Sequence, residues 1–215
     1  MTTKLLIPFA KNAEGKLVTA REVERGLDCN CTCISCGEPL LARHGKEKVW
    51  HFSHRSTGGV GGNDGCGEGS IHRAAKEALS QSIGKQFALP DFLRPPGTAK
   101  VRAKILRVVP EHYIEEAGRT VDCWIRLDVR CGHNWRVSKP LGIRDLAVEI
   151  AVSHKKDAAY RNDMRNADVP SIEIQISLDY IWKRIAKDKN LPVESLLRSI
   201  VLNMTTNREW LYLRE

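Results

Sequence analysis

Alternating apolar and polar positions in the second half of the chain predict two strands of the same design. In segment 146–153, aliphatic residues alternate with small or polar ones that include Glu149, and in 172–176 isoleucine alternates with Glu173 and a glutamine. Side chains alternate between the faces of a strand, so each strand would carry a glutamate opposite an aliphatic face. Between them, 157–167 has a helical pattern. The segment therefore predicts a βαβ unit with two parallel, neighbouring strands.

Weaker patterns predict the rest of the architecture. Segments 105–109 and 121–129 are further strand candidates, and an apolar stripe at helical spacing predicts a helix within 68–86. We therefore divide the chain into a region of short strands at 1–66, an α/β core at 67–180 and a helical tail at 181–215 that packs on the core.

Charge and composition narrow the class of protein. The 215 residues carry a net charge of +8, with a pI of about 9.2. A basic surface attracts polyanions, so nucleic acid is the expected class of partner. No apolar run approaches the ~18 residues that span a bilayer, and the N-terminus lacks the pattern of a secretory signal. We expect a cytoplasmic protein with no membrane partner.

Closely spaced cysteines and histidines predict a zinc site in the N-terminal region. The pair Cys33-x-x-Cys36 is followed along the chain by the pair His51-x-x-His54. Two close pairs of soft or borderline ligands can fill the tetrahedral positions around zinc. Because four protein ligands would leave no position open for water, we expect this zinc to be structural.

Other thiols and one histidine leave the ligand set open. Cys29 and Cys31 precede the first pair, and Cys66 follows the histidines; any of them could replace a named ligand, and His72 is a further candidate. A redox-active CxxC pair is the alternative interpretation. Such a pair belongs between a strand and a helix of an α/β domain, however, whereas this segment is rich in turns.

Several of these motifs occur together in one known family. Residues 31–54 combine the CxxC pair with His-Phe-x-His, and the helix that follows carries Glu68, His72 and Lys76. The blocks RTVD, LAVEIAVSH and PSIEIQIS follow further along the chain. In this combination the chain resembles the competence protein CoiA-like family over separated blocks between residues 29 and 177.

The resemblance implies a nuclease core of the PD-(D/E)XK type. In that fold, a mixed sheet flanked by helices presents an aspartate on one strand and a Glu-x-Lys motif on the next. Matched by motif, Asp122 is the aspartate and Glu149 is the glutamate, and together they would hold Mg²⁺ or Mn²⁺. The resemblance also assigns Glu68 and His72 to the site. The predicted fold class is α/β, a cysteine/histidine zinc module followed by a PD-(D/E)XK-like mixed sheet flanked by helices.

One position departs from the implied motif. Ala151 stands two residues after Glu149, where the fold usually has lysine. Lys155 shares the parity of that position along the strand, and Lys76 on the leading helix is a second substitute for the missing amine. On the next strand, Glu173 opens a Glu-x-Gln candidate that ranks after the two matched carboxylates.

Two main functions stay open on the sequence alone. The first is a metal-dependent deoxyribonuclease with structural zinc, and the resemblance favours DNA over RNA. The second is a catalytically inactive nuclease fold that binds DNA or a protein partner, which Ala151 favours. A third interpretation puts the chemistry at His51 and His54. Pairing of two copies to cut both strands also stays open, as do the substrate structure and the pathway.

Overall fold

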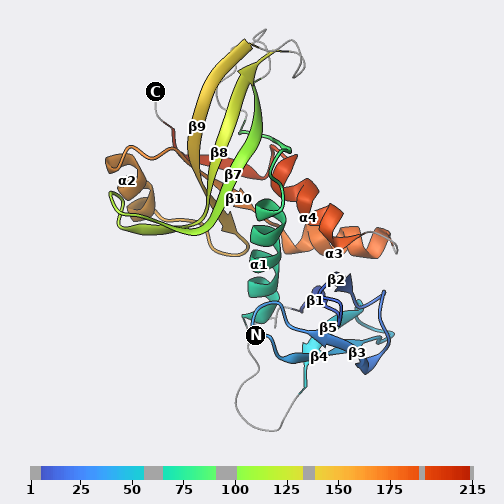
Figure 1. Cartoon of the computed structure of the whole chain (residues 1–215). Helices are drawn as coiled ribbons and strands as arrows, with labels where there is room; N and C mark the ends of the chain where they lie inside the picture. The colour runs from blue at the N-terminus through green and yellow to red at the C-terminus, as the bar shows by residue number, and fades with distance from the viewer. Residues whose placement is uncertain (1–5, 56–64, 91–100, 133–138, 189–191, 214–215) are drawn as a thin grey trace. The chain divides into compact units, whose positions relative to one another are not determined.

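The computed structural model describes residues 6–55, 65–90, 101–132, 139–188 and 192–213. The chain forms two compact units (Figure 1). The first is built from the residues up to Ala74 together with Ser177–Leu197, and the second from Ala75–Ile176 together with the residues from Arg198 onward. The segment 181–215, expected to be one tail, is thus shared between the units, which are described separately below.

The first unit contains an antiparallel sheet of short strands in the order β2-β1-β3-β4-β5. The strands are β1 (Phe9–Lys11), β2 (Leu17–Thr19), β3 (Gly26–Thr32), β4 (Pro39–Arg43) and β5 (His51–His54). Their buried side chains form one small apolar cluster, which includes Leu40, Phe52 and the thiols of Cys29, Cys31 and Cys33. The cysteine-rich segment is therefore part of the core of this unit.

Parts or all of three helices contribute to the first unit: α1, α3 and the beginning of α4 (Val193–Leu202). Helix α1 (Cys66–Ser80) begins slightly before the predicted helix and ends earlier, and the division between the units falls within it. Helix α3 (Leu178–Lys187) starts after Ser177, whose side chain accepts a hydrogen bond from the backbone of Tyr180 at 3.2 Å. Ile181 and Ile185 are buried, as expected for residues one turn apart on one helix face.

The second unit is a mixed sheet in the order β11-β10-β9-β8-β7-β6. The strands are β6 (Gln86–Phe87), β7 (Val101–Ile114), β8 (Arg119–Cys131), β9 (Lys139–Ala151), β10 (Ser171–Gln175) and β11 (Arg208–Tyr212). The long strands β7, β8 and β9 pair antiparallel and curve side by side (Figure 1). The predicted strands 105–109 and 121–129 lie inside β7 and β8, both of which extend further than the sequence pattern indicated.

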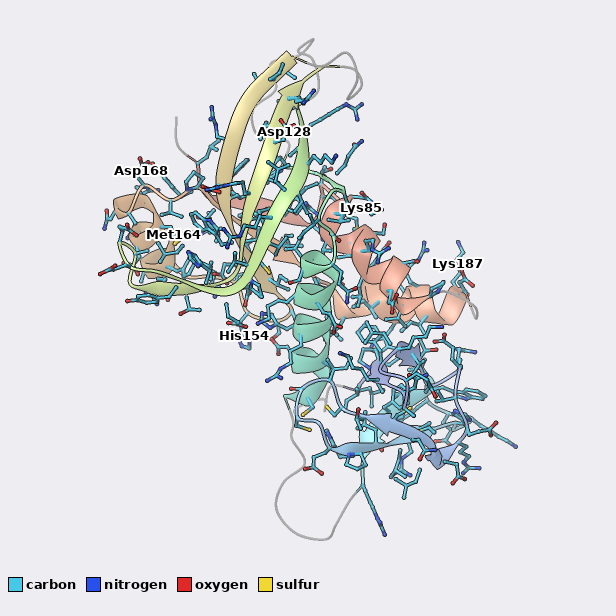
Figure 2. The ribbon with its side chains drawn as sticks, in the orientation of Figure 1. Lys85, Asp128, His154, Met164, Asp168 and Lys187 are labelled. Carbon is cyan, nitrogen blue, oxygen red and sulfur yellow. The ribbon has the colours of Figure 1, made fainter. Side chains whose placement is uncertain are left out.

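The predicted βαβ unit is confirmed. β9 and β10 are parallel neighbours, and α2 (Ala158–Asn166) lies between them in the chain. Asp157 caps α2 by accepting a hydrogen bond from the Tyr160 backbone at 2.8 Å. Tyr160 and Met164 pack with Val121 and Ala147 of the sheet in one buried cluster. Met164 is labelled in Figure 2. α2 therefore covers one face of β8 and β9 near the end of β9.

The α/β fold class expected from the sequence is confirmed, with a cysteine/histidine region before a mixed sheet accompanied by helices. The last helix, α4 (Val193–Leu202), precedes β11. The buried guanidinium of Arg208 on β11 donates to the Ile200 carbonyl of α4 at 3.1 Å. Across the described residues, no helix is long and apolar enough to span a membrane.

Candidate functional site

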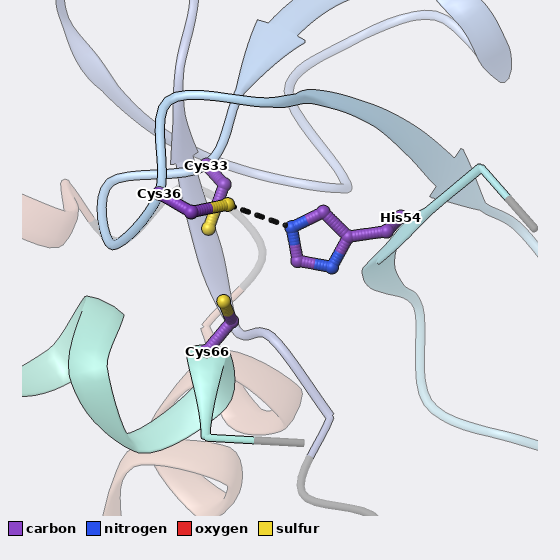
Figure 3. A group of neighbouring side chains, drawn as sticks. All are labelled: Cys33, Cys36, His54 and Cys66. Carbon is purple, nitrogen blue, oxygen red and sulfur yellow. Dashed lines mark hydrogen bonds between the residues drawn. The ribbon is translucent and has the colours of Figure 1, made fainter. Parts of the chain in front are cut away.

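Three cysteines and one histidine of the first unit converge on one point (Figure 3). The Sγ atoms of Cys33, Cys36 and Cys66 and one ring nitrogen of His54 all lie within 4.8 Å of one another. One of these contacts joins Cys36 Sγ to His54 Nε2 at 3.2 Å. We refer to these four residues as the thiol cluster.

A tight turn after β3 brings the first two thiols together. The N–H of Cys33 donates to the carbonyl of Glu38, and the N–H of Gly37 donates back to the carbonyl of Cys33, both at 2.8 Å. Gly37 has φ of 79°, a left-handed conformation that glycine adopts without steric cost. The turn therefore directs the side chains of Cys33 and Cys36, three residues apart in the sequence, to the same place.

The start of α1 approaches this turn closely and supplies the last thiol. Cys66 is the first residue of α1. A Cβ atom at Gly69 would lie 2.5 Å from Ser35 Oγ, so the absence of a side chain allows the helix to come this near. Ser70, one residue on, lies with its Oγ 3.7 Å from Cys33 Sγ. A larger residue at position 69 would require the Ser35 side chain to rotate and the turn to shift slightly.

The donor set and spacing of the thiol cluster fit a zinc ion. In a tetrahedral site with Zn–S of about 2.3 Å and Zn–N of about 2.0 Å, neighbouring ligand atoms lie about 3.5–3.8 Å apart, close to the spacing of these side chains. Burial and the neighbouring Cys33 thiol raise the pKa of Cys66 to about 12, so crowded thiols hold their protons when no cation balances them. The thiol cluster can therefore hold a metal such as zinc.

His51 lies outside the thiol cluster, contrary to the expectation that it pairs with His54 as a ligand. Its Nδ1 lies 2.8 Å from the carbonyl oxygen of Val49. The physical reason is strand alternation, because residues three apart on β5 point to opposite faces. Cys66 contributes the fourth ligand atom instead, which was one of the alternatives left open by the sequence.

The other thiols near the cluster serve the core of the first unit. Cys29 Sγ donates to the carbonyl of Leu40 at 3.4 Å, and Cys31 Sγ donates to the carbonyl of Cys29 at 3.1 Å. Both side chains are buried, and burial raises the pKa of Cys31 to about 12. They act as small packed side chains with local hydrogen bonds.

Strand register aligns carboxylates across the sheet of the second unit. The pairing of β9 with β10 sets Glu149 beside Glu173, and the pairing of β10 with β11 sets Glu173 beside Glu209. The antiparallel register of β8 with its two neighbours sets Asp122 opposite Glu149 on one side and Glu111 on the other. Each strand from β7 to β11 thus carries one acidic residue at the same level, and we call these residues the carboxylate row.

Asp122 is tied directly to β9. Its Oδ2 accepts a hydrogen bond from the backbone N–H of Ile150 at 2.8 Å, next to Glu149. Its Oδ1 lies 3.6 Å from Nζ of Lys76, which also forms an ion pair with Glu111. The Asp122 side chain keeps 13% of its surface exposed. The structure therefore brings the two principal carboxylates of the sequence prediction together at one place.

Glu149 is buried, with 1% of its side chain exposed. Its Oε1 accepts a hydrogen bond from the Tyr160 hydroxyl at 2.6 Å, and its Oε2 lies 2.9 Å from Nζ of Lys156. Burial, followed by the charge of Asp122, raises the pKa of Glu149 to about 7, against the opposing effects of Tyr160 and Lys156. Burial also raises the pKa of Tyr160, so its phenol stays protonated and donates.

Glu173 is fully buried beside Glu149. Its Oε2 accepts a hydrogen bond from the backbone N–H of Lys156 at 2.7 Å. Its other oxygen, Oε1, is buried and has no hydrogen-bond partner among the described residues. A buried carboxylate oxygen without a hydrogen-bond partner is costly, and a bound cation would offset this cost.

The lysines predicted to replace the missing amine lie in different places. Lys155 is exposed and forms an ion pair with Glu209 at 3.3 Å, on the edge of the carboxylate row and away from Glu149. Lys76 lies by Asp122. Lys156, which sequence reasoning missed, contacts Glu149 itself. Strand parity does not reach position 155, because β9 ends at Ala151 and the chain turns before α2.

Tyr160 was also missed, although the sequence holds a signal for it. Asp157 is a good N-cap residue, and a helix that starts there places Tyr160 in its first turn, facing back toward the end of the preceding strand. Glu68 and His72 lie on α1, eight and four residues before Lys76, on the stretch that belongs to the first unit. Both are half-buried.

Comparison with known proteins bears on the N-terminal region. Residues 17–59 match the family model of the competence protein CoiA, N-terminal domain. This confirms the resemblance to the CoiA-like family that the sequence motifs indicated, and the matched segment includes Cys33, Cys36 and His54 of the thiol cluster. No curated protein and no solved structure matches the chain at a significant level.

Proposed function

We propose that this protein is a metal-dependent nuclease that hydrolyses DNA phosphodiester bonds at the carboxylate row. The observation that carries the proposal is the alignment of Asp122 and Glu149 on neighbouring strands, with the buried Glu173 beside them. Burying carboxylates costs stability, and arrangements with this cost are common at sites that bind a ligand or carry out a reaction. The resemblance to CoiA-like proteins adds the expectation of a nuclease core of the same kind.

The donor set of the row fits a hard divalent cation. Mg²⁺ and Mn²⁺ prefer oxygen ligands, and carboxylates are their usual protein ligands. Asp122 and Glu149 would hold the ion, and the unpartnered Oε1 of Glu173 is a further oxygen available on the same side. When bound, such an ion neutralises charge that develops on the phosphate and makes water easier to deprotonate.

Neighbouring side chains hold both carboxylate oxygens of Glu149 in place. The Tyr160 hydroxyl holds one oxygen of Glu149, and the ammonium of Lys156 lies at the other. The hydrogen bond from the Ile150 backbone fixes the orientation of Asp122. Ligands whose orientation is set in advance bind and act with less loss of conformational entropy. The site would therefore be formed before the substrate arrives.

DNA is the proposed substrate because the sheet face that carries Asp122 continues into a basic surface. Even-numbered residues of β8 alternate with buried ones, so Arg126 and Arg130 share the face of Asp122. Strand pairing adds Arg107 and Arg102 of β7 beside them. Arg126 and Arg130 form ion pairs with Asp145 and Asp128, the latter labelled in Figure 2. Such a face suits phosphate contacts without sequence preference.

The thiol cluster is proposed to hold a structural zinc ion. Three thiolates and one histidine would fill the tetrahedral coordination and leave no position for water. The ion would join the turn after β3 to the start of α1 within the first unit. All seven cysteines are free thiols, which suits the reducing, cytoplasmic location that we propose.

A second function is favoured by one observation. Ala151 is buried and offers no amine at the position where the nuclease motif has lysine. A nuclease fold without that amine could bind DNA, or a protein partner, without cutting. This version predicts DNA binding that is the same in chelator and in Mg²⁺, with no products.

The experiment that separates the two functions compares binding with cleavage. The purified protein is incubated with labelled single-stranded and double-stranded DNA, and with RNA, in Mg²⁺, in Mn²⁺ and in chelator. Glu149→Ala is run beside it. We expect metal-dependent cleavage of DNA that Glu149→Ala abolishes while circular dichroism shows an unchanged fold. Binding without cleavage in every metal would replace the nuclease with the binding module.

A further inference from the structure

Ala151 is the motif position that lacks lysine, and β10, the parallel neighbour of β9, places a glutamine and not a cationic residue beside it. Ala151 is buried and lies in register with Gln175 of β10. The amide of Gln175 donates to Glu209 at 3.2 Å, at the edge of the carboxylate row. A cationic group beside Glu149 must therefore come from outside β9 and β10.

Lys156 provides a cation at that place. Its Nζ lies 2.9 Å from Glu149 Oε2, and it also lies 4.9 Å from the ring centroid of Tyr160. The Lys156 side chain is 36% exposed while that of Glu149 is 1% exposed. The ammonium thus lies between the buried carboxylate and solvent.

The backbone of the segment that carries Lys156 is held at two points. The Lys156 N–H donates to Glu173 Oε2 at 2.7 Å, and the next residue, Asp157, accepts from the backbone of Tyr160 at 2.8 Å. A buried carboxylate on one side and a helix cap on the other fix the turn between β9 and α2. The position of the ammonium is therefore set by the fold rather than by a free surface side chain.

On the basis of the nuclease function proposed above, we propose that Lys156 takes the role of the lysine that Ala151 lacks. The amine has moved from the strand to the turn before α2 and reaches the same carboxylate. In hydrolysis, a water oxygen forms a bond to phosphorus and the bond from phosphorus to the leaving sugar oxygen breaks. The water loses a proton to solvent and the leaving oxygen takes one up. The Lys156 ammonium stays charged, orients the water and stabilises charge on the phosphate oxygens.

Two other lysines fit the role less well. Lys155 forms its ion pair with Glu209, at 3.3 Å. Lys76 contacts Asp122 at 3.6 Å and forms an ion pair with Glu111. Neither has a contact with Glu149 as close as that of Lys156.

The test compares single-turnover DNA cleavage at saturating Mn²⁺ with direct Mn²⁺ binding. The variants are Lys156→Met, which keeps the length of the side chain, and Lys156→Arg, which keeps the charge. Lys76→Met is the rival variant. Lys183→Met is the matched control, because Lys183 also pairs with a carboxylate, Asp179, but on an exposed helix surface. Lys156→Gln, which retains a hydrogen-bond donor, serves if Lys156→Met does not fold.

We expect Lys156→Met to lower the single-turnover rate by about 10²–10³-fold, as for loss of one preorganised donor. Mn²⁺ affinity should be unchanged or higher, because a cation next to the ligands has been removed, and Lys156→Arg should restore part of the rate. A rate like that of the wild type, a loss that excess Mn²⁺ repairs, or a loss confined to Lys76→Met would each overturn the role of Lys156 and leave the nuclease function standing. A wild type that cuts in no metal removes both.

Discussion

The thiol cluster and the carboxylate row differ in how the chain assembles them. The thiol cluster collects its ligands from a turn, a strand end and the first residue of a helix, all between Cys33 and Cys66. The carboxylate row takes one residue from each strand between β7 and β11, from Glu111 to Glu209. The first site depends on local turns, and the second depends on the register of a whole sheet.

The two sites also differ in how their charge is balanced when no metal is bound. The thiol cluster crowds three thiols together, and burial raises the pKa of Cys66. The carboxylates have their own cations, since Lys76 lies by Asp122 and Lys156 by Glu149. The comparison therefore teaches that the first unit should need its metal to fold, whereas the second should fold without one and use a metal only for function.

The largest expected effect is loss of zinc from the first unit. His54→Ala removes a ligand that lies 3.2 Å from Cys36 Sγ, and structural zinc sites contribute apparent binding energies of about 10–16 kcal/mol to folding. We expect the variant to purify without stoichiometric zinc and its first unit to lose cooperative unfolding. Zinc is measured by elemental analysis, and unfolding by calorimetry.

His51→Ala is the matched control for this experiment, because His51 lies three residues away on the same strand and outside the cluster. It should keep one zinc per chain. Loss of zinc from His51→Ala and retention by His54→Ala would reverse the assignment and restore the ligand set expected from the sequence.

A large pH-dependent effect is expected in the second unit when Glu149 is neutralised. The unfolded chain releases this proton near pH 4.5 and the folded chain near pH 7, so the folded state binds more protons between these values and its stability falls as pH rises. The full loss corresponds to about 3 kcal/mol. Glu149→Gln removes it. In chelator, we expect the variant to be more stable than the wild type at pH 8 but not at pH 4.

Denaturant unfolding at several pH values measures this difference. Asp179→Asn is the control, because it also neutralises a carboxylate, but one in the first unit whose side chain is 72% exposed. A gain in stability for Glu149→Gln that is the same at every pH would show that burial of Glu149 is not the cause.

A smaller effect is expected when the unpartnered oxygen of Glu173 is replaced. Glu173→Gln keeps a carbonyl oxygen for the Lys156 N–H but puts an amide NH₂ where Oε1 has no partner. If that oxygen supports the cation, the Mn²⁺ concentration for half-maximal cleavage should rise about 10–100-fold. An unchanged Mn²⁺ requirement would restrict Glu173 to holding the turn at Lys156.

The smallest effect is expected on the basic face of β7 and β8. Arg107 is exposed and lies opposite Arg126 in the register of β7 with β8. Arg107→Ala should weaken binding of all DNA sequences by a similar factor and reduce the slope of log affinity against log salt by about 1. Fluorescence anisotropy at several salt concentrations measures both. A loss confined to one sequence would point to base recognition instead.

The two sites also differ in how far the sequence predicts them, because one depends on local turns and the other on the register of a whole sheet. The CxxC spacing places Cys33 and Cys36 in one turn, so the thiol cluster was predictable in outline. His51 does not join His54 in the thiol cluster, because residues three apart on a strand point to opposite faces. The exchange of His51 for Cys66 also needed the approach of α1, which rests on Gly69.

For the carboxylate row, periodicity located Glu149 and Glu173 on parallel neighbouring strands, and the structure adds the register that sets them side by side. The resemblance supplied Asp122. The cation at Glu149 was not predictable from strand parity, because parity ends where β9 ends at Ala151. The helix cap at Asp157 is a local signal in the sequence. The contacts of Lys156 and Tyr160 with Glu149, however, are tertiary and depend on how the turn and α2 pack against β9.

The most direct test of the central claim is a Mn²⁺ titration of zinc-loaded protein followed by electron paramagnetic resonance, with DNA cleavage measured over the same Mn²⁺ range. The wild type is compared with the double variant Asp122→Asn/Glu149→Gln. The account predicts that the wild type binds Mn²⁺, that cleavage appears as binding saturates, and that the double variant loses both while its fold remains. Equal Mn²⁺ binding by the double variant, or cleavage that persists in it, would contradict the claim that the carboxylate row is the metal site.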